Sequence, residues 1–137
     1  MEVKQIKFFR KTIKALDKEI NILIVNREHI NQVIKNLEKS LMTLSMEVEK
    51  EKKLSRQILN FEFGEFFEEC KKRRQQVEDE IKRNKVIVED LILELKEKFN
   101  KQKKYEILLS KIEEKVKTQN KLNEQKRLDE LIQQRYI

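Results

Sequence analysis

The chain has 137 residues and a formal net charge of +7, with 42% charged and 38% hydrophobic residues, one Gly, no Pro and no Trp. This composition is typical of long charged helices rather than of a compact globular core. It also argues against a membrane span, because the longest uninterrupted apolar run is Ile22–Val25 and a span needs about 20 residues. The N-terminal stretch lacks the apolar core of a secretory signal, and the single cysteine, Cys70, has no partner for an internal disulfide. We therefore expect a cytoplasmic protein without membrane insertion.

The side chains that enzymes use for small-molecule chemistry are scarce in this chain. It has one histidine, His29, and neither a glycine-rich loop nor a Cys/His cluster with metal-ligand spacing. Neighbouring carboxylates such as Glu113 and Glu114 point in different directions on a helix and do not converge on a substrate. The sequence therefore predicts a non-enzyme without metal or cofactor, in which His29 is solvated and Cys70 is a buried, inert thiol.

The first predicted helix covers about residues 3–59 and carries a heptad repeat. Its seam of positions spaced three and four apart is apolar at every position but Arg27. The seam consists of Ile6, Phe9, Ile13, Leu16, Ile20, Leu23, Arg27, Ile30, Ile34, Leu37, Leu41, Leu44 and Val48. The charged residues between these positions fit an exposed outer face.

A break in the repeat predicts a turn at about residues 60–64, followed by a second helix at about 65–134. The break contains Gly64, the only glycine, which we expect to act as an N-cap or as a left-handed turn residue. A second, weaker seam follows in a different frame. It consists of Phe67, Cys70, Arg74, Val77, Ile81, Asn84, Val88, Leu91, Leu95, Lys98, Gln102, Tyr105, Leu109, Ile112 and Val116.

Two seams separated by a break predict an all-α fold, a long two-helix antiparallel coiled-coil hairpin that forms one domain and is monomeric. If the turn is centred near residue 62, residues pair when their numbers total about 124, so that Ile6 lies beside Thr118. The C-terminal helix then overhangs from about Gln119 onward. The alternative is a continuous helix that dimerises in parallel, because one glycine inside a helix costs only about 1 kcal/mol.

Positive charge gathers at the end of the hairpin that carries both termini. Residues 1–18 have a formal charge of +4 and residues 96–137 of +5, whereas residues 19–95 carry −2. Such a field favours docking to an acidic or polar partner. Carboxylates such as Glu113 and Asp129 interrupt the basic residues, which argues against a nucleic-acid partner, since phosphate-binding faces usually lack them.

Some apolar residues fall outside both seams and are expected on the outer face. They are Ile22, Val25, Val86, Leu93 and Ile107, with Phe66 beside the seam near the turn. A further stripe follows the end of the second seam, at the spacing of one helical face. It consists of Leu128, Leu131, Ile132 and Tyr136. An unsupported helix is marginal in water, so residues 123–137 are expected to fray until a partner covers them.

Two C-terminal stretches carry a resemblance to a known family. LKEKFNKQKKYEILLSK (residues 95–111) and NEQKRLDELIQQRY (residues 123–136) resemble the end of the FliJ family, small cytoplasmic proteins of the flagellar export apparatus. The YscO-type proteins of virulence type III secretion are similar. The most telling positions lie in the charged run around "LDE", namely Glu124, Lys126, Leu128, Asp129, Glu130 and Arg135.

The resemblance implies a non-enzymatic stalk, similar to the central coiled coil of rotary ATPases, located in the cytoplasm at the membrane export apparatus. Its partners would be the hexameric export ATPase, the cytoplasmic domain of the export-gate membrane protein, and export chaperones. The implied ATPase-binding residues are Lys4, Lys7, Arg10, Lys11, Lys126, Arg127, Leu128, Asp129, Glu130, Ile132 and Arg135. The implied export-gate residues are Phe66, Phe67, Cys70 and Arg74, although these phenylalanines would equally suit a cap on the hairpin core. The alternative function is a generic structural or adaptor coiled coil that forms a homodimer.

Overall fold

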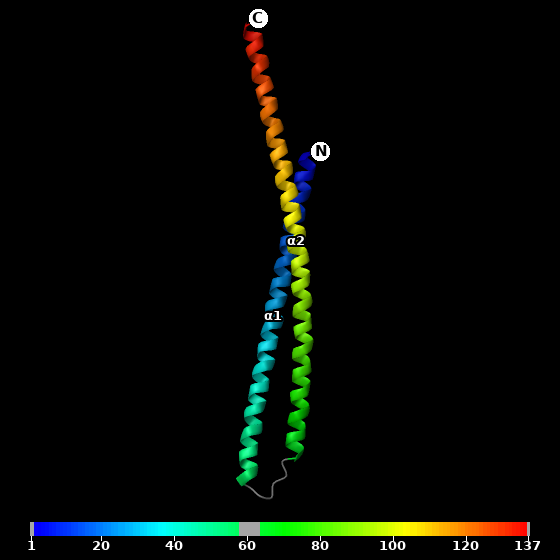
Figure 1. Ribbon diagram of the computed structural model, residues 1–137, viewed down its shortest axis with the longest axis vertical. Helices are drawn as coiled ribbons and strands as arrows, with labels where there is room; N and C mark the ends of the chain where they lie inside the picture. Colours follow the sequence, from blue (N-terminus) through cyan, green and yellow to red (C-terminus); the bar gives the residue numbers. More distant parts are fainter. Residues whose placement is uncertain (1, 58–63, 137) are drawn as a thin grey trace. The chain divides into compact units, whose positions relative to one another are not determined.

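The computed structural model describes residues 2–57 and 64–136, which form two helices, α1 (Glu2–Gln57) and α2 (Gly64–Tyr136) (Figure 1). The helices pack against each other in opposite directions, since Glu2 contacts Lys115 while Glu19 contacts Lys98. The predicted all-α antiparallel hairpin is thus confirmed. The last two residues predicted for the first helix, 58–59, and the turn at 60–63 lie outside the described residues.

Gly64 is the first residue of α2 rather than the last residue of the turn. Its φ angle is not in the left-handed region, so the predicted left-handed role is wrong. A Cβ atom at this position would meet no neighbouring atom within 4 Å. Glu65 in the first turn of α2 and Arg56 in the last turn of α1 have the charges that the helix dipole favours at those ends.

The core is a single row of side chains between the helices, and all of its buried members belong to the two predicted seams. The chain divides into two units, residues 1–21 with 96–137 (the terminal unit) and residues 22–95 (the turn unit). The terminal unit buries Leu16 and Ile20. The turn unit buries Leu23, Ile34, Leu44, Cys70, Ile81 and Leu95. Each helix covers only one face of the other, so the sides of the interface stay open to solvent. For this reason the remaining seam residues are mostly half-buried.

The polar residues of the second seam each form a hydrogen bond or ion pair. In the terminal unit, Lys98 Nζ lies 2.9 Å from a Glu19 carboxylate oxygen, and Gln102 donates to the backbone carbonyl of Ile13. In the turn unit, Arg74 donates to the Ser45 hydroxyl. Asn84 donates to the backbone carbonyl of Glu80 in its own helix. These contacts lower the cost of placing polar groups on a half-buried face.

The register within the terminal unit differs from the prediction. The ring centroid of Tyr105 lies 5.7 Å from that of Phe9, whereas the predicted register placed Tyr105 opposite residue 19. The ion pair between Lys115 and Glu2 is displaced by seven residues from the predicted pairing and the Tyr105–Phe9 contact by ten, whereas Arg10 and Glu113 lie within one residue of it. A slide of about one heptad leaves both seams facing each other, so the predicted seams hold although most of the predicted partners do not.

Candidate functional site

The last part of α2 extends beyond its packing partner. Val116 is the last half-buried residue, and every described side chain from Lys117 to Arg135 is exposed. We call residues 117–136 the overhang. Its observed start agrees with the overhang predicted from about Gln119. The overhang is helical through Tyr136, which is consistent with the absence of a nucleation cost for lengthening an existing helix. The fraying of residues 123–137 in the free protein stays a prediction.

The overhang carries an apolar stripe on one of its faces. The side chains of Leu128, Leu131 and Ile132 are 56%, 54% and 54% exposed, and they are spaced three and four residues apart. We call these three residues the tail stripe. With Gln134 and Arg135 they line a shallow hollow formed by this helix alone. Clustered apolar side chains that no other part of the described chain covers are typical of protein-binding surfaces.

Charged groups of both signs flank the tail stripe. They are Lys126, Arg127, Asp129, Glu130 and Arg135. All five are exposed, and none forms an ion pair within the described part of the chain. They are therefore available to complementary charges on a partner, which would fix the orientation of an apolar contact.

The N-terminal residues predicted for the same role lie on α1 in the terminal unit. Lys4, Lys7 and Lys11 are exposed. Arg10 is instead engaged with Glu113 of α2 at 2.9 Å, an exposed pair of the kind that contributes only about 0–1 kcal/mol. The ion pairs between α1 and α2 extend to Lys115. The C-terminal residues predicted for the same role begin at Lys126, which is 11 residues later and about 16 Å further along the helix. The structure brings the two sets into one unit but does not bring them into contact.

The four residues predicted near the turn differ in accessibility. Phe66 and Phe67 are half-buried, with ring centroids 5.7 Å apart in an edge-to-face arrangement. Phe66 lines a hollow together with Leu44 and Cys70, and its half-buried side chain fits both the contact role and the capping role that the sequence left open. Cys70 is buried, as predicted, so it can influence a partner only through the packing of its neighbours.

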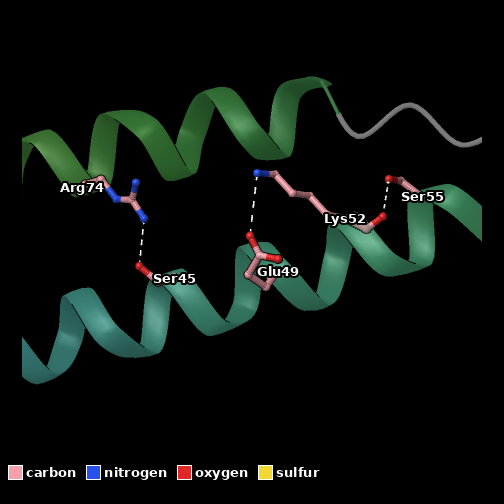
Figure 2. Close-up of polar contacts among 5 residues, drawn as sticks. All are labelled: Ser45, Glu49, Lys52, Ser55 and Arg74. Atoms are coloured by element: carbon pink, nitrogen blue, oxygen red, sulfur yellow. Dashed lines mark hydrogen bonds and ion pairs between the residues drawn. The ribbon is translucent and has the colours of Figure 1, made fainter.

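Arg74 is the most accessible of these four residues. It lies on a seam position yet is exposed, and its guanidinium reaches from α2 to α1, where it donates to the Ser45 hydroxyl at 2.8 Å (Figure 2). Further along α1, Lys52 lies 3.8 Å from Glu49, and the Ser55 hydroxyl donates to the Lys52 carbonyl. The surface beside Arg74 therefore carries charged groups of both signs, next to the apolar side chains of Val48 and Phe67 that line the same hollow as Arg74.

The five outer-face apolar residues are exposed as predicted: Ile22, Val25, Val86, Leu93 and Ile107. On α1, five further exposed apolar residues were not singled out from the sequence, namely Val3, Phe8, Met42, Met46 and Leu54. The heptad repeat could have identified them, because each is an apolar residue that lies outside the positions of the first seam and so does not face α2.

The described residues contain no group of three or more His, Cys, Asp or Glu side chains that is arranged to hold a metal ion. Neither described helix combines the length and apolar character needed to cross a membrane. No family model matches the chain, and no curated protein or solved structure matches it. The candidate surfaces are thus characterised by their own geometry, in which apolar and charged side chains are exposed side by side.

Proposed function

We propose that this protein is the non-enzymatic central stalk of a type III, flagellar-type protein export ATPase. In this proposal the end of the hairpin that carries both termini inserts into the ATPase hexamer. The observation that carries the proposal is the overhang, in which 19 consecutive side chains, Lys117 to Arg135, are exposed on a helix. The resemblance of the two C-terminal stretches to the FliJ family supports the same assignment.

The partner surface follows from the chemistry of the overhang. The tail stripe would be buried against an apolar strip of the ATPase pore, and the flanking charges would meet complementary groups at its rim. The terminal unit has 18 basic and 10 acidic side chains, a formal charge of +8. This field would accelerate encounter with an acidic pore mouth. Lys4, Lys7, Arg10 and Lys11 contribute to the field, and Arg10 exchanges its weak pairing with Glu113 for a partner carboxylate.

The turn unit would contact the cytoplasmic domain of the export-gate membrane protein. Phe66 and Arg74 keep part of their surface accessible and would make this contact. Phe67 and Cys70 would contribute only by packing beside these two residues. The protein would act as a cytoplasmic monomer at the membrane export apparatus and would escort export chaperones. This function needs no cofactor, because the proposed role consists of binding other proteins and includes no catalysed reaction.

The test uses two matched double variants of the overhang and the cognate ATPase. Leu128→Glu with Ile132→Glu places two negative charges in the tail stripe. Asn123→Glu with Gln133→Glu places two negative charges away from the stripe on the same helix. Buried apolar anchors of this kind contribute about 2 kcal/mol or more each, so the first variant should bind the hexamer at least a hundredfold more weakly and fail to stimulate ATP hydrolysis.

The control variant should bind and stimulate like the natural chain. Equal loss in both variants would mean that charge alone governs the contact, and unchanged binding in the first variant would refute the stalk assignment. Truncation after Leu122 provides an independent check, since it removes the whole stripe and should abolish stimulation.

A second candidate is a structural or adaptor coiled coil that forms a homodimer. It is favoured by Val86 and Leu93, which are exposed and seven residues apart on one face of α2, the spacing of a further coiled-coil seam. Sedimentation velocity separates the two candidates. The stalk should sediment as a 16.8 kDa monomer, whereas the adaptor should sediment at twice that mass.

A further inference from the structure

The outer face of α1 in the terminal unit carries an unbroken row of lysines. Lys4, Lys7, Lys11, Lys14 and Lys18 are spaced three and four residues apart and all are exposed. This spacing places them on one side of the helix, away from the seam that packs on α2. We call these five residues the lysine face. Its length is about 21 Å, from 14 residues at about 1.5 Å each.

Within the described residues, no carboxylate forms an ion pair with this row. Within residues 2–19 the acidic side chains are Glu2, Asp17 and Glu19. Glu2 and Glu19 are paired with Lys115 and Lys98 of α2, and Asp17 lies toward the flank of the face. None of the five lysines forms an ion pair within the described part of the chain, so their charge is directed outward.

Exposed apolar side chains accompany the lysines on the same helix. Phe8 is 60% exposed and Val3 is 63% exposed, and Ala15 is exposed one heptad after Phe8. The Phe8 ring rests edge-to-face on Phe9 with centroids 5.7 Å apart. Because Phe9 in turn contacts Tyr105, Phe8 is held on a packed aromatic pair while remaining open to solvent.

We propose that the lysine face binds the surface of an anionic phospholipid bilayer, with residues 3–18 of α1 lying along the membrane plane and Phe8 entering the headgroup region. A straight row of lysines matches a flat, diffuse negative surface, toward which each lysine contributes about fivefold in affinity, the factor equivalent to about 1 kcal/mol. Phe8 and Val3 add apolar contact of the kind that interfacial helices make.

Nucleic acid fits the same face less well. The apolar neighbours of the lysines have no role against phosphates, and the row contains no arginine for bidentate recognition of phosphate or guanine. Tyr105 is half-buried against Phe9, which leaves Phe8 as the one exposed ring among the residues of α1 from Glu2 to Glu19, too few for the series of aromatic side chains on which successive bases stack. The observations therefore favour a lipid surface.

This inference goes beyond the proposed function, because a stalk needs no contact with lipid. Lys4, Lys7 and Lys11 also belong to the set proposed to contact the ATPase, so the two contacts exclude each other. A chain held on the membrane would leave it before inserting into the hexamer.

The test measures co-sedimentation of the full chain with vesicles of phosphatidylcholine that contain phosphatidylglycerol, and with vesicles of phosphatidylcholine alone. The test variant changes all five lysines of the face to Gln. The matched control changes Lys35, Lys39, Lys50, Lys53 and Lys71 to Gln; all five are exposed in the turn unit, so both variants lose the same charge. Circular dichroism establishes that both variants remain folded.

The natural chain and the control should bind the anionic vesicles, and the test variant should bind them more than a hundredfold more weakly. Binding should weaken as salt is raised and should be absent with phosphatidylcholine alone. Equal loss in test and control variants, or failure of the natural chain to bind anionic vesicles, would overturn the proposal. Binding to duplex DNA or RNA that depends on the same lysines, without vesicle binding, would also overturn it.

A second measurement locates the contact directly. The chain contains no Trp, so Phe8→Trp introduces a single fluorophore at the exposed edge of the lysine face. Its emission should shift to the blue with anionic vesicles, while an Ile107→Trp control at an exposed position of α2 in the same unit should not shift. Because no ATPase is present in either measurement, failure here leaves the proposed stalk function standing, and failure of the stalk test leaves this result standing.

Discussion

Ile20 and Ile22 offer a matched test of the single-row core. Both are isoleucines of α1, two residues apart, yet Ile20 is 2% exposed and Ile22 is 60% exposed. Replacing each in turn with Ala makes the same chemical change in the same helix. A difference in the free energy of unfolding between the two variants therefore reports burial alone.

The expected magnitudes follow from these exposures. At Ile20 the change removes three buried carbons at about 0.8 kcal/mol each. The cavity term is small because the row is open to solvent on both sides, so we expect a loss of about 2–3 kcal/mol, the lower part of the range for such substitutions. At Ile22 the small loss of contact is offset by the higher helix propensity of Ala, and the change should stay within about 0.5 kcal/mol.

The assay is urea unfolding followed by far-ultraviolet circular dichroism at several protein concentrations. Leu95 and Leu93 on α2, which are 4% and 59% exposed, form a second pair in which the same contrast is expected. A midpoint that does not change with concentration shows that the measured stability belongs to a monomer. Similar losses at Ile20 and Ile22 would refute the reasoning, because the outer face of α1 would then be packed as well.

Three further outcomes are expected. Phe66→Ala should cost about 1–2 kcal/mol, less than the roughly 3–5 kcal/mol of a fully buried phenylalanine, because its side chain is half-buried. A urea titration that shows no loss would mean that this side chain contributes no packing. Truncation after Leu122 removes 14 of the 129 helical residues and should lower the helical circular-dichroism signal in that proportion. The free energy of unfolding should change by less than about 0.5 kcal/mol, because the truncation removes no buried side chain. A double-mutant cycle on Arg10 and Glu113 should give a coupling energy below about 1 kcal/mol that falls with added salt; a larger, salt-insensitive value would mean that the pair is shielded from solvent.

The sequence by itself determined which face of each helix is buried. A heptad repeat puts its apolar positions on one side of a helix whatever the partner is. The side chains that the structure buries, from Leu16 on α1 to Leu95 on α2, therefore all fall on the predicted seams. The overhang was also predictable, because the apolar repeat of α2 stops at Val116 while its helix-forming residues continue to Tyr136.

The register was decided only by the tertiary structure. Sliding the helices by one heptad keeps apolar residues opposite apolar residues, so the seams alone describe several nearly equivalent alignments. The structure selects one in which Phe9 stacks on Tyr105, Lys98 reaches Glu19 and Gln102 reaches the carbonyl of Ile13. Each of these contacts joins residues about 80 or more positions apart, and no local pattern encodes such a pair.

The accessibility of individual seam residues likewise depended on packing. Phe66 is off the seam yet half-buried, while Arg74 is on the seam yet exposed, since its long side chain reaches across to Ser45 rather than into the row. Periodicity describes the direction of a Cα–Cβ bond, whereas exposure depends on where a long side chain ends and on what lies beside it. Sequence therefore predicted the surfaces of this protein as faces of helices, and the packed structure determined which atoms on those faces a partner can touch.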